Sequence, residues 1–413
     1  MSRLTGLLTD EEFSDLPDEA AEIHLVRHSV LYRYLYMITS ILEYVEASRT
    51  IIEFSVPLQR LVAHKDRRVR VLLYALPEVN YSWEDLVGRL TQLARQLEIP
   101  ISVSPPAPAV WAIGFPGLQP GQTLTHSLLA HELGHGIVQP QSFVISLRRK
   151  ARIDSGALGR FIADTYQPQL PRQLRQLVRR SLRQTLDAIL LEWLEEIACD
   201  VIGYEIMGPA FLFSAVYFLP SLSPLDQCSE KYPPVRLRIN LLYRLLKADL
   251  DLPPGQVPKD YEGWFGAEAS GFLLEWDRRV SVSERYPQPY DLAVNAVSAG
   301  FNEVCALVRG RMAPIPRYKF SDHQEAVKQL TSRISLSVPP SELDNPQGVP
   351  ADPACILNAG WISYFSLVDS LSREHGWDEW ETRARIEDWT AKALELQEVL
   401  RRWREVYSVN ENY

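Results

Sequence analysis

The part of the sequence that says most about the fold is a short stretch near the end of the first third, and it reads Leu128-Leu129-Ala130-His131-Glu132-Leu133-Gly134-His135. Its last five residues form the pattern H-E-x-x-H. On an α-helix, positions i and i+4 share a face, so His131 and His135 can present two imidazoles to one metal ion. Glu132 lies beside them and can reach a water molecule held by that metal. The apolar neighbours predict a buried helix over about 123–138 rather than a helix with two surface histidines. Burying two imidazoles without polar partners costs free energy, so a binding partner such as a metal is expected.

A third protein ligand is needed for a catalytic zinc. It is expected on a long helix beginning near Pro171, in the stretch Glu192-Trp193-Leu194-Glu195-Glu196-Ile197-Ala198-Cys199-Asp200. Glu196 and Asp200 are one turn apart, so Glu196 can bind the metal while Asp200 accepts the free N–H of a ligand histidine. Glu192 and Glu195 stay open as alternative ligands, although Glu195 is rotated by about 100° and is expected to face elsewhere. Cys199 is expected to be a core residue.

The two motifs together resemble a gluzincin metallopeptidase, and they are most similar to the CAAX prenyl protease and HtpX-like group, which has HExxH followed by ExxxD on a later helix. The resemblance covers about residues 110–246 and implies a zincin-like core. That group often has a His-Pro segment with an Arg six residues after the His, and this chain has Tyr232-Pro233-Pro234-Val235-Arg236-Leu237-Arg238. By resemblance, Arg238 helps to stabilise a tetrahedral oxyanion. Tyr232 replaces the family histidine and can donate a hydrogen bond in its place.

The periodicities predict the α+β class, predominantly α-helical, with helical regions flanking the metallopeptidase core. We expect an N-terminal helical region over 1–66, the metallopeptidase domain over 67–250 and a C-terminal helical region over 251–413. Strands are expected over 68–75, 99–103 and 110–115, and Ser82 is expected to cap a helix running to about Leu97. The strand over 110–115 could pair an extended substrate or could be an internal strand.

Two further segments are expected to be helical. The apolar run Ile206–Leu219 is shorter than the roughly 20 residues of a membrane helix, so a buried core helix is favoured over insertion into a membrane surface. The segment 354–407 is expected to form two helices broken near Gly376.

Charge and cysteine content restrict the partners and the compartment. The net charge is −9, from 43 Lys and Arg against 52 Asp and Glu, which argues against a nucleic-acid partner. The basic region Arg148–Arg183 could contact an acidic partner or an anionic membrane surface, or it could be a solvated helix face. The 4 cysteines lack close paired spacing, which predicts a reducing compartment. Because we expect neither a signal peptide nor a transmembrane segment, a cytoplasmic location is predicted.

These observations predict a soluble zinc metallopeptidase, a hydrolase that cleaves peptide bonds within a protein or peptide substrate. The expected cofactor is Zn²⁺, bound by His131, His135 and Glu196, and the expected chemistry is attack by a metal-activated water with Glu132 as general base. The alternative is a catalytically inactive scaffold that keeps the protease fold and binds a protein partner. The intact Glu132 favours the enzyme, and Tyr232 slightly favours the scaffold.

Overall fold

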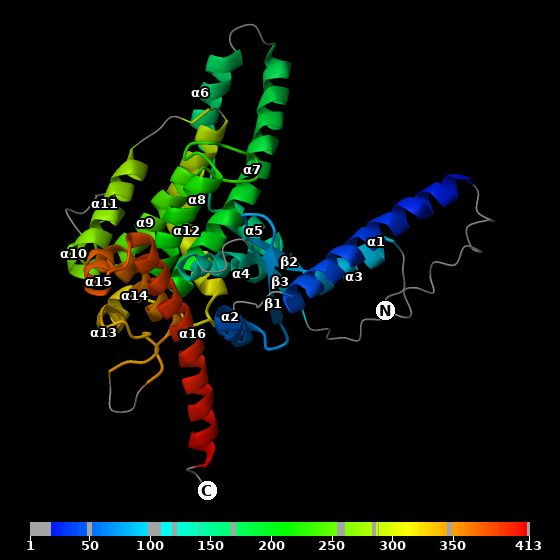
Figure 1. Cartoon of the computed structure of the whole chain (residues 1–413). Coiled ribbons are helices and arrows are strands. Elements are labelled where there is room, and N and C mark those ends of the chain that lie inside the picture. The colour runs from blue at the N-terminus through cyan, green and yellow to red at the C-terminus, as the bar shows by residue number, and fades with distance from the viewer. Residues whose placement is uncertain are drawn as a thin grey trace.

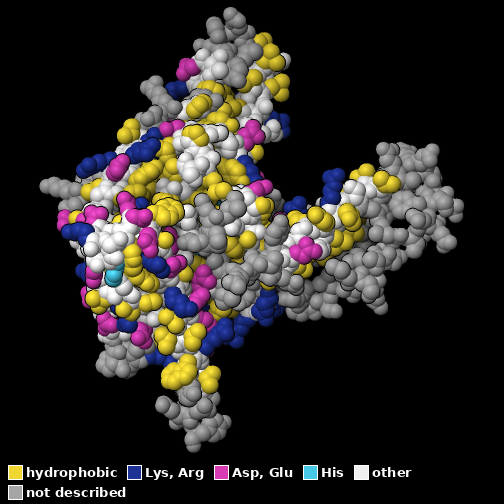
Figure 2. All heavy atoms as spheres, in the orientation of Figure 1, with side chains coloured by type: hydrophobic (Ala, Val, Ile, Leu, Met, Phe, Trp, Pro, Cys, Tyr) yellow, Lys and Arg dark blue, Asp and Glu magenta, His cyan; other side chains and the backbone are white. Residues whose placement is uncertain are grey.

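A computed structural model describes residues 18–47, 52–97, 109–117, 122–139, 141–166, 171–253, 261–282, 286–287, 289–344 and 349–410. The described residues are predominantly helical and include a small three-stranded sheet, which confirms the expected mostly helical α+β class, and the zincin-like core stays a prediction. In Figure 1, α1 and α16 extend away from the body in different directions, and α6 and α7 rise from it together. Figure 2 shows hydrophobic side chains exposed along that α6–α7 projection.

The elements follow one another in this order. The first half of the chain contains α1 (Asp18–Ala47), α2 (Ile52–Lys65), β1 (Arg70–Leu76), β2 (Ser82–Asp85), α3 (Leu86–Gln96), β3 (Val110–Pro116), the 3₁₀ helix η3 (Thr123–Leu128), α4 (Leu129–Val138), α5 (Gln141–Arg148), α6 (Ser155–Tyr166) and α7 (Arg172–Met207). The second half contains α8 (Pro209–Leu222), α9 (Val235–Asp249), α10 (Glu262–Phe265), α11 (Ala267–Ser281), α12 (Tyr290–Arg311), α13 (Phe320–Ser335), α14 (Pro353–Ser366), α15 (Val368–His375) and α16 (Glu379–Asn410).

The sheet has the strand order β1-β3-β2. β3 pairs with β1 in parallel, with Leu73 opposite Ile113, and with β2 antiparallel, with Trp83 opposite Ile113. The middle strand is therefore β3, and both of its edges are already paired. Of the two interpretations of the strand over 110–115, the internal strand is confirmed, and an added substrate strand at this position is wrong.

The expected helix cap at Ser82 is also wrong. Ser82 begins β2, and the side chain of Asp85 caps α3 by accepting a hydrogen bond from the Gly88 N–H at 3.0 Å. The physical reason is that pairing with β3 places Ser82–Asp85 in a strand, so the helix starts three residues later. The strand expected over 99–103 lies outside the described residues.

The apolar run after α7 forms α8, whose residues from Pro209 to Val216 are all buried, so the buried core helix is confirmed. Gly208 separates the two helices with a φ of 60°, a left-handed value that favours glycine. The C-terminal segment contains three helices rather than two, because α14 ends at Ser366 and α15 starts again at Val368. The break expected at Gly376 is present, with a φ of 72° that ends α15.

One hydrophobic core extends from Phe54 to Leu394 and draws on all three predicted regions. The division of the chain at residues 66 and 250 stays a prediction. Among the described helices, α12 is the one long and apolar enough to cross a membrane by length and composition, and half of its most apolar window is buried inside the protein. It packs against α7 and α4, as a core helix does.

The contact that positions the site is the crossing of α4 over α7. At Gly134 the two backbones approach so closely that a β-carbon there would lie 2.9 Å from Cα of Cys199. Glycine is therefore required at this position, because any side chain would have to move one helix away from the other. The close crossing puts the H-E-x-x-H face of α4 directly against the carboxylates of α7.

Candidate metal centre

Two histidines and one glutamate converge where α4 meets α7. His131 Nε2 lies 3.4 Å from Glu196 Oε2, and His135 Nε2 lies 3.7 Å from Glu196 Oε1. The two imidazole centroids are 5.1 Å apart. Ligand atoms around a tetrahedral zinc with bonds of about 2.0–2.1 Å are separated by about 3.3 Å. The three side chains therefore fit a zinc ion with small adjustments, and the structure brings together the three ligands expected from the sequence.

Each histidine is oriented by a carboxylate on its other nitrogen. His131 Nδ1 lies 2.9 Å from Asp200 Oδ1, which is the pairing expected from the one-turn spacing of Glu196 and Asp200. His135 Nδ1 lies 3.1 Å from Glu195 Oε1. When both Nδ1 atoms donate to carboxylates, both Nε2 atoms are left as acceptors that face Glu196. This arrangement fixes the tautomer and raises the basicity of a metal-binding imidazole.

The position of Glu195 corrects the expectation that it faces elsewhere. His131 and His135 lie one turn apart on α4. Because the two helices cross, the two histidines contact different positions around the surface of α7. Glu196 reaches both Nε2 atoms, while Glu195 reaches the outer side of His135 from the next position. Glu192 lines the same cavity, but within the described residues it makes no hydrogen bond or ion pair with either histidine.

Arg238, at the first turn of α9, closes the buried end of the site. Its Nε donates to Asp200 Oδ2 at 2.7 Å and its Nη2 donates to Asp200 Oδ1 at 2.7 Å, while Nη1 lies 3.6 Å from Glu196 Oε2. Two of its nitrogens are therefore occupied with holding Asp200. The expected role of Arg238 in stabilising an oxyanion stays a prediction, and it rests on Nη1.

The charges of the buried groups determine their pKa values. Burial raises the pKa of Asp200, but Arg238 and His131 outweigh burial and hold it well below its usual range. Burial also raises the pKa of Glu196, and the hydrogen bond from His131 and the charge of Arg238 lower it to about 2. Burial lowers the pKa of His131, but Asp200 and Glu196 raise it to about 10. Without a metal, these carboxylates therefore hold a proton on His131 Nε2, and a bound metal ion would replace that proton.

Glu132 and Tyr232 both line a cavity of about 800 Å³ that contains the convergent groups. Glu132 is buried, and its burial raises its pKa above the ordinary value of a glutamate, in the direction that suits a general base. Tyr232 lies at the mouth with 45% of its surface exposed, and its backbone N–H donates to Ser229 Oγ at 2.7 Å. Within the described residues, Tyr232 makes no hydrogen bond to the histidines or to Arg238, so its replacement of the family histidine stays a prediction.

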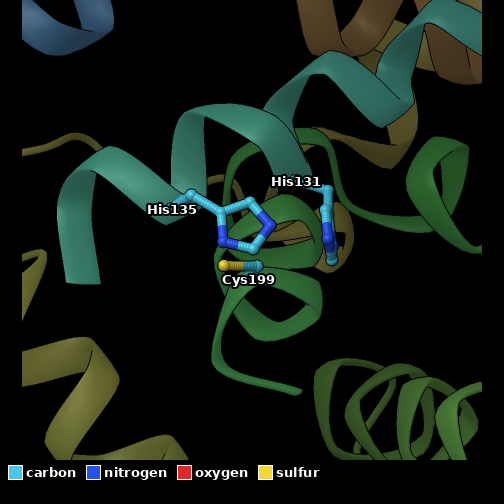
Figure 3. Close-up of side chains that lie close together, drawn as sticks. All are labelled: His131, His135 and Cys199. Atoms are coloured by element: carbon cyan, nitrogen blue, oxygen red, sulfur yellow. The ribbon is translucent and has the colours of Figure 1, made fainter. Parts of the chain in front are cut away.

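Cys199 offers a further donor at the crossing. It comes from α7, between the two helices, and its Sγ and one nitrogen from each of His131 and His135 all lie within 4.8 Å of one another (Figure 3). The thiol is completely buried, and burial raises its pKa well above the usual value, whereas metal binding requires the thiolate. Both Nε2 atoms point to Glu196 instead. The geometry therefore favours Glu196 as the third ligand, with Cys199 packed beneath the site against Gly134.

Sequence reasoning missed Trp83 in the wall of the cavity. Its ring stacks on that of His135 with centroids 6.3 Å apart, and it meets Trp111 edge to face at 6.2 Å. The indole Nε1 of Trp83 has no hydrogen-bond partner among the described residues. No local signal marks Trp83, because only the pairing of β2 with β3 brings it to His135.

Comparisons of the chain with protein-family models, with curated proteins and with solved structures found no match.

Proposed function

We propose that this chain is a zinc-dependent endopeptidase and that the α4–α7 crossing is the centre of a zincin-like core. One observation carries the proposal: the Nε2 atoms of two histidines converge on the carboxylate of Glu196 while both Nδ1 atoms are held by other carboxylates. Histidines that bind a metal almost always donate their other N–H to such an orienting partner, so this arrangement supports a metal site. The resemblance of the two sequence motifs to gluzincin metallopeptidases supports the same conclusion.

The fit of the donor set defines what each residue does. His131, His135 and Glu196 would hold the metal, which matches the three protein ligands of catalytic zinc sites. Bound zinc polarises a scissile carbonyl and lowers the pKa of water to about 7. Asp200 and Glu195 orient the two imidazoles, and Arg238 holds Asp200.

Glu132 is the residue that moves the proton. It is the buried carboxylate of the H-E-x-x-H helix that lines the cavity without holding either imidazole. In the proposed reaction it accepts a proton as water attacks the peptide carbonyl, and it then passes that proton to the leaving amine. The cavity of about 800 Å³ has room for several residues of an extended peptide on both sides of the scissile bond.

The test compares the purified wild-type chain with Glu132→Gln, using metal analysis and cleavage mapping on a whole-cell peptide library. We expect about one zinc per chain in both proteins and a loss of cleavage of at least about 100-fold in the variant, the usual contribution of a general base. Zinc retained without cleavage in either protein would favour the alternative, a scaffold that binds a protein partner. Cleavage that persists in the variant would exclude Glu132 as the base.

A further inference from the structure

The N-terminal half of α7 leaves the body of the protein. α7 extends beyond the core alongside α6, and Figure 1 shows the two helices rising together. Between Pro171 and Thr185 every residue whose side chain is described is exposed, except the half-buried Val178 and Leu182. A helix of this length therefore presents several turns of one surface to solvent.

This surface is basic, and its arginines have no ionic partner among the described residues. The sequence from 167 to 186 contains no Asp or Glu. The exposed side chains of Arg175, Arg179, Arg180 and Arg183 form no ion pair with any described residue. By contrast, Arg148 at the base of the hairpin is paired with Asp187. In a chain of net charge −9, these four arginines create a local positive potential.

Exposed leucines adjoin the arginines. Leu174 is 46% exposed and Leu177 is 61% exposed. At about 100° per residue, Leu177, Arg180 and Arg183 lie within about 120° of one another around the helix and share one face, whereas Leu174 lies on the side opposite Arg183. A basic helix face that also exposes leucines is typical of helices that lie in the interface of an anionic membrane.

We propose that the N-terminal half of α7 docks onto an anionic lipid bilayer, with Arg179, Arg180 and Arg183 against the headgroups and Leu177 at the edge of the acyl region. A bilayer satisfies both the charge and the exposed leucine without requiring a matched shape. Nucleic acid suits the surface less well, because no aromatic side chain alternates with the arginines. The proposal does not depend on peptidase activity.

The basic surface and the candidate metal centre lie on the same helix. Arg175 and Glu196 are separated by 21 positions on the same helix, and a rise of 1.5 Å per residue makes that about 32 Å along the axis. The substituted arginines are therefore well separated from the candidate metal centre.

The experiment measures co-sedimentation of the full chain with vesicles of phosphatidylcholine, with or without phosphatidylserine. The variant Arg179→Glu/Arg180→Glu/Arg183→Glu is compared with the control Arg67→Glu/Arg278→Glu/Lys328→Glu, which reverses three exposed charges elsewhere and changes the net charge equally. We expect wild-type binding that needs phosphatidylserine and weakens with salt, at least about a tenfold loss in the first variant, and little change in the control. Leu177→Ser should weaken binding without changing its salt dependence.

Three outcomes would overturn the proposal: equal binding to neutral and anionic vesicles, an equal loss in both charge-reversal variants, or binding of the wild type to polyglutamate but not to vesicles, which would assign the surface to an acidic protein. Melting curves and zinc content are expected to be the same in all these variants, since the substituted residues are exposed and far from the metal centre. Loss of vesicle binding with zinc content retained separates this proposal from the proposed function.

Discussion

The charged side chains named in the two halves of α7 differ in whether they have ionic partners. In the C-terminal half, Glu195, Glu196 and Asp200 each face an imidazole or a guanidinium within 3.7 Å. In the N-terminal half, Arg175, Arg179, Arg180 and Arg183 face solvent, with no carboxylate opposite them among the described residues. One continuous helix therefore joins a surface of paired, mostly buried charges to a surface of unpaired, exposed charges.

The difference follows from the free energy of burying charge. An exposed arginine keeps its hydration and gains at most about 1 kcal/mol from a partner, so it can remain unpaired and free to bind something else. A buried carboxylate loses its hydration and must be compensated. Near the candidate metal centre, four carboxylates (Glu132, Glu195, Glu196 and Asp200) accompany one guanidinium, Arg238, and two histidines. A bound divalent cation would balance this excess of negative charge.

The largest effect is expected from removing a ligand at the buried end. Glu196→Ala deletes a side chain that faces both Nε2 atoms, so zinc affinity should fall by more than the roughly 100-fold that losing an orienting partner costs. Competition against a chromophoric chelator measures this change. A chelator should also remove zinc and any peptide cleavage from the wild type, and both should return when zinc is added back.

Glu192→Ala is the matched control for the ligand variant. Glu192 lies one turn before Glu196 on the same helix and lines the same cavity, but it contacts neither histidine among the described residues. Its substitution should leave zinc affinity unchanged. If Glu192→Ala loses zinc while Glu196→Ala keeps it, the ligand assignment is wrong.

The next largest effects are expected from the two carboxylates that orient the histidines. Asp200→Ala and Glu195→Ala should each lower zinc affinity by about 10- to 100-fold. Asp200 should have the larger effect, because it is buried and also holds Arg238, whereas the Glu195 side chain is 39% exposed. Asp200→Ala should in addition destabilise the fold by about 3 kcal/mol, because it leaves the buried guanidinium without its main counter-charge.

These two variants also test whether Glu195 orients His135. If Glu195→Ala has no effect on zinc affinity in the same competition assay, then His135 is oriented by something other than the 3.1 Å contact with Glu195. Urea unfolding of the metal-free proteins should show a stability loss for Asp200→Ala alone.

A third effect is expected from widening the helix crossing. In Gly134→Ala, the new methyl group would meet the backbone of Cys199 at 2.9 Å, so α4 must move away from α7. We expect a loss of about 1–3 kcal/mol in the free energy of unfolding, the usual result of overpacking, together with weaker zinc binding. Gly310→Ala is the control, since a methyl group there meets nothing within 4 Å. Should the two substitutions have equal effects in thermal unfolding, the close crossing is not what positions the ligands.

The parts of the site that could be predicted from the sequence follow from the residue spacing within one helix. The i, i+4 spacing puts His131 and His135 on one face, and the same rule puts Glu196 and Asp200 on one face, whatever the rest of the chain does. The pairing of Asp200 with His131 then follows once the two helices meet. The buried helices could be predicted for the same reason, since the apolar run of α8 needs no partner to be recognised.

The parts that could not be predicted depend on how two elements meet. The contact of Glu195 with His135 depends on the angle at which α4 crosses α7. Helical periodicity within one helix does not predict the crossing angle between two helices. The order β1-β3-β2 is set by pairings between distant segments, so Ser82 was expected in a helix cap and Trp83 was missed at the cavity wall. The expected zinc, cleavage activity, domain boundaries and cytoplasmic location stay predictions.

The smallest effect is expected from replacing the arginines at the exposed N-terminal end of α7. Arg175→Gln, Arg179→Gln and Arg180→Gln each remove a charge that has no carboxylate partner among the described residues, on a turn where the side chain faces solvent. Glutamine keeps the helix propensity and much of the side-chain length, so each variant should change the free energy of unfolding by no more than about 0.5 kcal/mol. The three changes should add, because none of them breaks a shared ion pair. Urea unfolding of the single and triple variants measures this directly. A loss of about 2 kcal/mol or more in the triple variant would mean that these arginines stabilise the fold, and the contrast between a paired half and an unpaired half of α7 would no longer hold.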